Sequence, residues 1–587
     1  PWSGGAIAMR TEGRFLIAIT LMMGVLVGTN ILFPPVVPDE VPVLEGEVEG
    51  GAPAEATGDP TSGAEAPTIP DALQGGQPDE ASPLPGGTVE ATESPDVPPL
   101  ANEPEKLVRV TSPLYEMTFS NHGAVLRSVR LTDYESFTQE GEVELVHDAS
   151  RGMLGGRLVV GNDTVSLADF VYSVSPETDL QLADGSGPQT LTFRYDHPEG
   201  RFFSEIRYTF HADRYVVDVD GNLPSLDRAA LFIDLGPGLA YNELDEAGEE
   251  RVSAFAGNSS DERITSRPMT KVDEAEQIEG PLVWGAAKTQ FFLAAILPGV
   301  GQGQGQLLSG VWAEPYQEGR ANVRVGAQVQ NGGAYGYQAY LGPMERARLT
   351  AMGDQLQEVN PYGWRFLRPI IRPVVGGILW VLNFLHDRLL LGYGWVLIVF
   401  GVVMRILLWP LNQKAMRAQL KNMAAQPLMQ AAQKKYKDNP EQLQKEMVKL
   451  YKEHGFNPLG GCLPMLLPWP VLIALFFVFQ NTIELRGESF LWLPDLAAPD
   501  PLYLLPLFLG LSMFLLQFIS FRSMDQVNPQ MKMMMWFMPI MMMFIFFRFA
   551  SGLNLYYATS NIATLPQQWL IAKERKKARA APPLKSS

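Results

Sequence analysis

The chain has 587 residues, a formal net charge of −18, 46% hydrophobic residues and one cysteine. The lone Cys462 excludes an internal disulfide framework and a cysteine-cluster metal site. Sixteen acidic residues and no Lys or Arg lie between residues 34 and 105, so the acidity belongs largely to one segment and says little about partners.

The first element is residues 15–33, which are uncharged and follow Arg10 and Arg14. We expect an uncleaved membrane anchor with residues 1–14 in the cytoplasm. The alternative is a cleavable signal, but the apolar stretch exceeds the usual length of about 7–15 residues and no A-x-A site follows. Residues 34–106 are rich in Pro and acid, which predicts a disordered linker on the far side of the membrane.

Short runs of alternating polar and apolar residues, separated by turn sequences, fill residues 107–360. This period of two predicts a large antiparallel β-sandwich. The stretch Met344 to Val359 is typical of a helix that leaves the sandwich. The histidines show no metal-ligand spacing, so we expect neither a metal nor another cofactor.

Residues 361–388 form an amphipathic stretch that Pro369 and Pro373 interrupt. Its uncharged part, 373–386, has 14 residues and is too short to cross a bilayer of about 30 Å. We therefore expect an interfacial helix on the outer side. The alternative, a spanning helix, would reverse the orientation of everything that follows.

Residues 389–410 are apolar and long enough to span, with Arg405 as the single charge. An arginine near the centre of a span costs about 2.5–3.5 kcal/mol on insertion scales. No acidic residue lies within the later apolar runs, where Glu484 and Arg548 stand only at the outer ends. A wetted cavity open to the cytoplasm is the environment we expect for Arg405. The alternative is an arginine that snorkels to the inner headgroups.

Nine basic and four acidic residues lie in residues 411–462, which places this segment in the cytoplasm. Two helical patterns predict a hairpin, with Asn439 as the N-cap of the second helix and Pro440 at its first position. We expect either a solvated connector or a contact surface formed by lysines, namely Lys434, Lys435, Lys437, Lys445 and Lys449.

Four more apolar runs follow, and we predict that each spans the membrane: residues 463–483, 501–521, 533–548 and 549–572. Two of the predicted connections are an outer loop (484–500) and a cytoplasmic loop (522–532). The last predicted span is followed by a basic cytoplasmic tail (573–587). The predicted fold class is therefore a membrane protein with six transmembrane helices and a large all-β domain outside. The eight methionines between Met531 and Met543 suit either a buried core or a surface that accepts varied sequences.

No residue set resembles a catalytic centre, because the sequence has no phosphate-binding loop, metal cluster or nucleophile with a base. We therefore expect a protein that is not an enzyme. Apart from Arg405, the polar residues within the predicted spans are uncharged. We expect four of them to line the cavity together with Arg405, namely Gln480, Gln517, Asn554 and Asn561.

The chain resembles the YidC membrane insertase family of Gram-negative bacteria along nearly its whole length. The matching motifs are RILLWPL at 405–411, NPLGGCLP at 457–464, DPLYLLP at 500–506 and SGLNLYYATSN at 551–561. The resemblance implies a hydrophilic groove in the inner leaflet, closed on the outer side, with Arg405 as its charged residue. It also implies substrate contacts at Tyr556 or Tyr557, and it places Gly401 where the family pattern has a small polar residue.

The resemblance implies that the protein inserts nascent membrane proteins into the inner membrane, with lipids, the Sec translocon and the ribosome as further partners. Two alternatives come from other classes. A secondary transporter or channel would use Arg405 to bind a small anion, although such proteins usually show paired inverted repeats. A membrane-tethered binding protein would work through its β domain and would fail when residues 107–340 are deleted.

Overall fold

The computed structural model describes residues 104–410, 469–522 and 529–580, with scattered residues between 411 and 468 and gaps at 161–162, 201, 225–228, 300–306, 318, 331, 361 and 363–366. All of these residues belong to one compact unit, Glu93–Ser587. The predicted anchor (15–33), most of the predicted linker, most of the hairpin and the motif at 457–464 lie outside the described residues.

A five-stranded sheet opens the β domain, in the order β4-β3-β2-β1-β8. Neighbouring strands are antiparallel except for β1 and β8, which pair in parallel with Val110 opposite Leu180. The strands are β1 (Leu107–Thr111), β2 (Tyr115–Ser120), β3 (Leu126–Glu135), β4 (Glu142–Glu144) and β8 (Leu180–Gln181).

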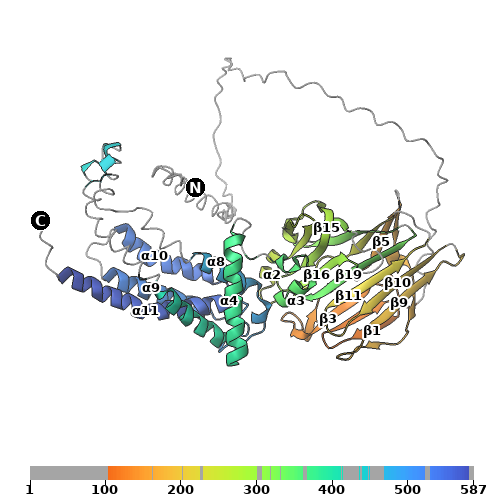
Figure 1. Cartoon of the computed structure of the whole chain (residues 1–587), viewed down its shortest axis with the longest axis horizontal. Coiled ribbons are helices and arrows are strands. Elements are labelled where there is room, and N and C mark those ends of the chain that lie inside the picture. The colour runs from red at the N-terminus through yellow and green to blue at the C-terminus, as the bar shows by residue number, and fades with distance from the viewer. Residues whose placement is uncertain are drawn as a thin grey trace, which may run out of the picture. The chain divides into compact units, whose positions relative to one another are not determined.

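The second sheet has 14 strands among the described residues, twelve of them in the order β6-β5-β12-β18-β17-β15-β16-β19-β11-β10-β9-β7, with β13 paired to β15 and β14 paired to β13. Its strands are β5 (Gly156–Val160), β6 (Asp163–Ser166), β7 (Ser173–Ser175), β9 (Gln189–Asp196), β10 (Phe203–Phe210), β11 (Val216–Asn222), β12 (Ala230–Asp234), β13 (Ala254–Ser259), β14 (Ile264–Pro268), β15 (Glu276–Lys288), β16 (Phe292–Pro298), β17 (Leu308–Pro315), β18 (Ala321–Gln328) and β19 (Ala334–Pro343). Figure 1 shows both sheets in the β domain.

The core of the β domain lies between the two sheets. Alternate residues of β10 point inward, and Phe119 of β2 meets Tyr208 of β10 with ring centroids 4.7 Å apart. Side chains from both sheets thus form one apolar layer, as in a sandwich. The predicted β-sandwich is confirmed.

Helices follow the sheets and form the rest of the described chain. They are α2 (Glu246–Val252) and α3 (Arg346–Met352) in the β domain, then α4 (Arg368–Leu389), Tyr393–Pro410, α8 (Trp469–Asn481), α9 (Leu504–Arg522), α10 (Pro529–Phe546) and α11 (Ser551–Ala580). Short 3-10 turns lie at Leu167–Asp169, Met269–Lys271, Leu356–Glu358 and Ile483–Leu485. The expected continuous helix from Met344 to Val359 is divided, because Gly353 ends α3 in a left-handed conformation with φ of 83°.

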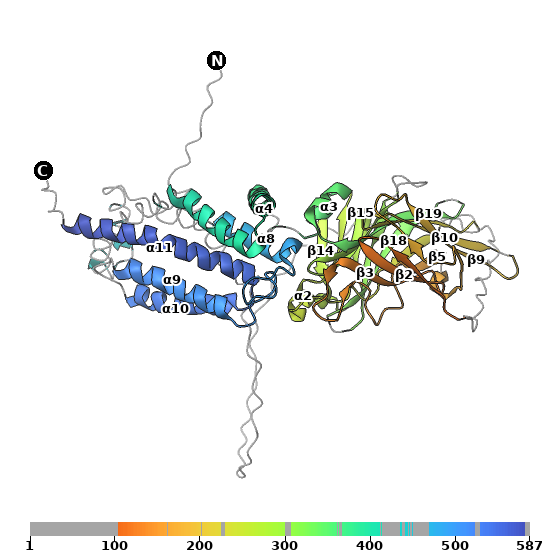
Figure 2. The ribbon, with the colours of Figure 1, turned by 90° about the horizontal axis from the view of Figure 1, so that it is seen from below.

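The helical region packs as a bundle with one element lying across it. α9 packs against α10 and α11, and α4 packs against α8. In Figures 1 and 2, α4 runs crosswise to α9, α10 and α11, which is the arrangement expected if those helices span a membrane and α4 lies in its plane. The interfacial position of α4 stays a prediction.

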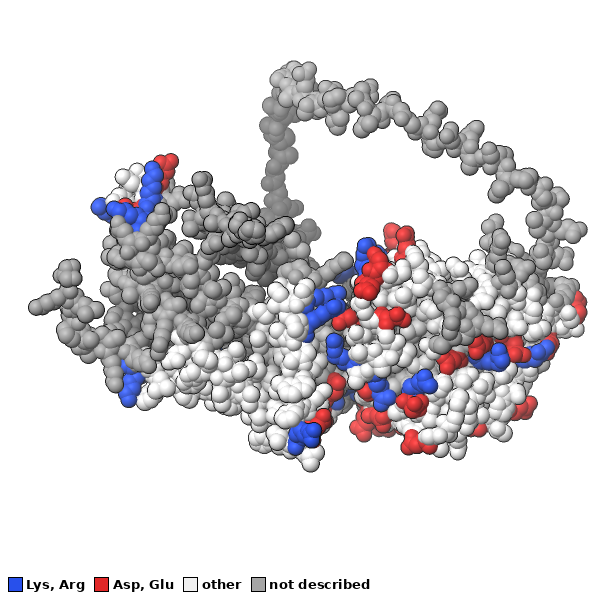
Figure 3. Space-filling view, in the orientation of Figure 1, with Lys and Arg blue, Asp and Glu red and all other residues white. Residues whose placement is uncertain are grey.

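Among the described residues, α4 and Tyr393–Pro410 are long and apolar enough to cross a membrane, by length and composition alone. The apolar segments of α8, α9 and α10 are shorter, and α11 combines its apolar part with polar residues and a basic end. The structure confirms a helical region beside a β-sandwich but does not confirm six spans. On the face drawn in Figure 3, charged side chains gather over the β domain, whereas the described part of the bundle shows mostly uncharged residues.

Candidate functional site

Arg405 lies in the second half of the helix Tyr393–Pro410, at the edge between its buried and exposed faces. Val396, Leu397 and Phe400 are fully buried, whereas Ile406 and Leu407 are each 66% exposed. The Arg405 side chain is half-buried, and its Nε atom is buried without a hydrogen-bond partner. Within the described part of the chain, no carboxylate forms an ion pair with Arg405. This arrangement leaves a cation whose hydrogen-bonding capacity the described residues do not meet.

The face of this helix that carries Gly401 packs against α11. A Cβ atom at Gly401 would lie 3.3 Å from Cγ2 of Thr559, so the glycine permits a close approach of the two helices. Phe400 contacts the ring of Tyr556 at 5.6 Å between centroids, and Tyr556 is close enough to Arg405 to interact electrostatically. The structure therefore brings Arg405, Gly401 and Tyr556 together.

Two polar side chains of α11 bond to neighbouring helices. Asn561 donates from Nδ2 to the hydroxyl of Ser512 on α9 (3.0 Å), and Gln567 donates from Nε2 to the carbonyl of Trp409 (3.4 Å). Such bonds satisfy polar groups that would be costly in hydrocarbon. α11 thus carries polar contacts on both sides, toward α9 and toward the Arg405 helix.

The other predicted residues have different neighbours in the bundle. Asn554 is fully buried and donates to the carbonyl of Phe546 (3.1 Å), where it joins α11 to the end of α10. Gln480 is half-buried at the end of α8, and its carbonyl accepts a hydrogen bond from Gln290 of the β domain. Tyr557 packs against Phe546 at 5.3 Å, and Gln517 is half-buried on α9. The structure therefore does not gather Gln480 and Asn554 around Arg405.

Two residues near the site were not predicted, Ser512 and Thr559. Ser512 is a buried hydroxyl in the apolar run of α9, and this isolation within an apolar sequence is the signal that would have identified it. The contact between Thr559 and Gly401 joins two distant segments, so no local pattern indicates it.

The predicted hairpin surface is described only in part. Lys435, Lys445 and Lys449 are described, whereas Lys434 and Lys437 lie outside the described residues. The N-cap prediction is confirmed, because Oδ1 of Asn439 accepts a hydrogen bond from the amide of Gln442 at 3.2 Å.

Comparison with known proteins accounts for both parts of the chain. Residues 107–375 match the model of the YidC periplasmic domain, and residues 384–579 match the model described as 60Kd inner membrane protein. A membrane protein insertase YidC from Chlorobium limicola is 30% identical over 80% of this chain and 82% of its own length. One from Prosthecochloris aestuarii is 31% identical over 80% of this chain and 83% of its own length.

The chain belongs to the YidC family of membrane protein insertases.

A solved structure of an active YidC insertase with its first transmembrane domain resolved is 17% identical, covers 80% of this chain and 95% of its own, and has a TM-score of 0.32. The family resemblance seen in the sequence is confirmed by the relatives' identity and coverage. In this YidC family member, the residues that the structure gathers are those of the Arg405 helix and α11, including the YYATSN segment.

Proposed function

We propose that this protein inserts nascent membrane proteins through a hydrophilic groove that contains Arg405. The observation that supports this proposal is the buried, unpartnered Nε of Arg405 in an apolar helix. A fixed positive charge in a wetted groove attracts the hydrophilic, often acidic, segment of a passenger protein. The apolar segment of the passenger then slides out into lipid along the Arg405 helix and α11, and its hydrophobic transfer provides the driving force.

The wider arrangement is part of the same proposal. We place the protein in the bacterial inner membrane with six spans, the β domain in the periplasm and both termini in the cytoplasm. The lysines of the hairpin and the basic tail lie on the cytoplasmic side, where a ribosome and the Sec translocon deliver passengers. Gln517, Asn561 and Tyr557 belong to the proposed passenger path together with Gly401 and Tyr556.

The test changes only the charge at position 405. Arg405→Lys is expected to retain insertion, whereas Arg405→Ala and Arg405→Glu slow the insertion of passengers with acidic translocated tails by about tenfold or more, because one lost charge interaction is worth about 1–2 kcal/mol. Insertion is measured by protease protection of the passenger tail in proteoliposomes, at matched protein levels. Arg522→Glu is the matched control, because Arg522 is an exposed arginine at the end of α9. Unchanged insertion by the Arg405→Glu protein contradicts the mechanism.

A further inference from the structure

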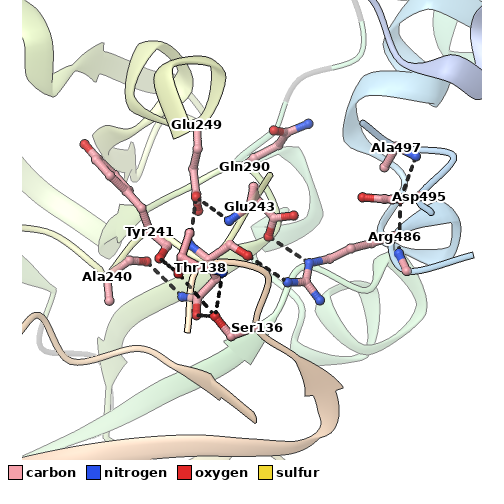
Figure 4. A network of polar contacts seen from close by, with 12 residues as sticks. Ser136, Thr138, Ala240, Tyr241, Glu243, Glu249, Gln290, Arg486, Asp495 and Ala497 are labelled. Carbon is pink, nitrogen blue, oxygen red and sulfur yellow. Dashed lines mark hydrogen bonds and ion pairs between the residues drawn. The ribbon is translucent and has the colours of Figure 1, made fainter. Parts of the chain in front are cut away.

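The β domain contacts the side chain of Arg486 at a site that we call the Arg486 socket; it consists of Asn242, Glu243, Phe137 and Phe292. Glu249 of α2 organises its floor, because Oε2 of Glu249 accepts hydrogen bonds from the amides of Asn242 (2.8 Å) and Glu243 (3.0 Å). The segment after β3 forms one side of the socket, where the amide of Phe137 donates to the carbonyl of Asn242 at 3.0 Å. Figure 4 shows Glu243 and Glu249 of this network, together with the guanidinium of Arg486.

Arg486 fills the socket from the segment between α8 and α9, the predicted outer loop. Its Nε donates to Oε1 of Glu243 at 2.7 Å, and Nη2 donates to the carbonyl of Asn242 at 3.3 Å. The guanidinium lies 4.7 Å from the ring centre of Phe137 and 5.1 Å from that of Phe292. The two charged side chains are only 2% and 5% exposed, so the pair is withdrawn from water.

A buried ion pair seldom adds much stability, because desolvation offsets the Coulomb attraction. Here burial raises the pKa of Glu243, and the adjacent Arg486 guanidinium opposes this rise. Such a pair can instead select one arrangement, because every misdocked state leaves a buried charge without its partner. The pair therefore indicates a specific contact between the β domain and the loop.

The same loop is tied to the start of α11 through Asp495. Oδ1 of Asp495 accepts hydrogen bonds from the amides of Gly487 (3.1 Å) and Ala497 (2.8 Å), and its carbonyl accepts one from Ser551 Oγ (2.8 Å). The amide of Gly552 donates to the carbonyl of Leu496 at 2.8 Å. The Arg486 segment is thus hydrogen-bonded to the start of the helix that carries Tyr556.

A second contact joins the β domain to α8. Gln290 donates from Nε2 to the carbonyl of Gln480 at 3.2 Å, and Asn360 donates to the carbonyl of Gln290 at 3.2 Å. Beside these bonds lies a cavity of about 130 Å³, lined among others by Lys288, Asp495 and Arg548. A polar, incompletely packed interface of this kind can separate more readily than an apolar core.

We propose that Arg486 is a positioning residue, which docks the loop between α8 and α9 into the β domain and thereby fixes the ends of α8 and α11 that close the groove on its outer side. The predicted effect on insertion rests on the proposed insertase function, whereas the docking of Arg486 into the β domain does not depend on that function. The β domain then regulates the groove from outside the membrane.

The docking is tested by hydrogen exchange of the full chain in lipid nanodiscs. Arg486→Gln and Glu243→Gln are each expected to speed exchange about tenfold or more in both residues 240–253 and residues 484–498, because the two segments lose one shared contact. The double variant is expected to match the singles rather than add to them. Arg267→Gln is the control, because Arg267 forms an exposed ion pair with Glu276 within the β domain. Faster exchange confined to the segment that carries the substitution, or unchanged exchange, overturns the proposal.

The consequence is tested by insertion of the same passengers in the same variants. Arg486→Gln and Glu243→Gln are expected to slow insertion by a similar factor, and Arg486→Lys is expected to recover part of it. If exchange responds in both segments but insertion does not change, the loop docks without positioning the groove, and the proposal is overturned at that step. Failure of the Arg405 test with a positive exchange result contradicts the proposed function alone.

Discussion

Gly401 shows how closely one residue sets the distance between the Arg405 helix and α11. An added Cβ would lie 3.3 Å from Thr559 Cγ2, whereas a Cβ at Gly377 of α4 would meet nothing within 4 Å. Gly377→Ala is therefore expected to raise the free energy of unfolding by about 0.5–1 kcal/mol. Gly401→Ala is expected to lower it by about 1 kcal/mol, because the packed neighbour must move.

Thr559→Ser supplies the control for this contact, because serine lacks Cγ2. The double variant Gly401→Ala with Thr559→Ser is expected to recover most of the loss, as measured by thermal unfolding in detergent. Additive effects of the two substitutions contradict the contact.

Lys288 gives the β domain a pH dependence of known sign. The Lys288 residue is 7% exposed, its ammonium donates to the carbonyl of Val252 at 3.1 Å, and burial lowers its pKa from 10.5 to about 8. Between these pH values the unfolded chain holds a proton that the folded chain has released, so stability rises from pH 8 to 10.5. Lys288→Met is expected to remove this rise and to increase stability at pH 7 by about 1–2 kcal/mol.

The check is the unfolding temperature of the full chain measured from pH 7 to pH 10.5. Lys271→Met serves as the control, because Lys271 is exposed. A rise that persists in Lys288→Met shows that another group produces it.

Among the elements, α9 begins where it does because Asp500 organises the preceding turn. This carboxylate is 1% exposed; Oδ2 accepts from the amide of Leu505 (2.7 Å), and Oδ1 accepts from the amide of Leu502 (3.0 Å) and Trp492 Nε1 (3.2 Å). Asp500→Ala is expected to lower the free energy of unfolding by about 2–3 kcal/mol, because buried donors lose their acceptor. Asp500→Asn, which keeps one oxygen, is expected to lose about half as much.

Thermal unfolding in detergent measures both variants, with the exposed Ser489→Ala as the control. Equal losses in Asp500→Asn and Asp500→Ala contradict the role of the two carboxylate oxygens. The bonds give a physical reason for the DPLYLLP motif, which the sequence alone identified only by resemblance.

The sequence predicted strands well where only one face of the strand is buried, and poorly where both faces are buried. β10 alternates between buried and exposed residues, so its period of two was visible, whereas six of the seven residues of β16 are buried and show no alternation. At the candidate site, the isolated charge of Arg405 was visible as a chemical anomaly. Its closeness to Gly401 and Tyr556 depends on helix packing between distant segments, which only the resemblance suggested.

At the scale of the whole molecule, the β domain contacts the bundle at Arg486. A deletion of the β domain distinguishes a docking role of Arg486 from a role within its own loop. Removal of residues 107–340 takes away Glu243 and the socket, so Arg486 becomes solvated and no buried charge is left unpaired. The insertase proposal predicts that the protein without these residues still inserts passengers, and the docking proposal predicts that it does so at the slower rate of Arg486→Gln in the full chain. In the full chain, by contrast, loss of one partner leaves a buried charge, which costs about 3–5 kcal/mol.

The two backgrounds therefore predict different effects of one substitution. Arg486→Gln is expected to slow passenger insertion in the full chain and to have no further effect in the protein that lacks residues 107–340. The comparison uses proteoliposomes with equal amounts of each protein, and Arg405→Glu in both backgrounds serves as the control that must impair insertion in each. If Arg486→Gln slows insertion equally in both backgrounds, Arg486 acts within its own loop, because a docking contact has no effect once the domain that forms its socket is absent.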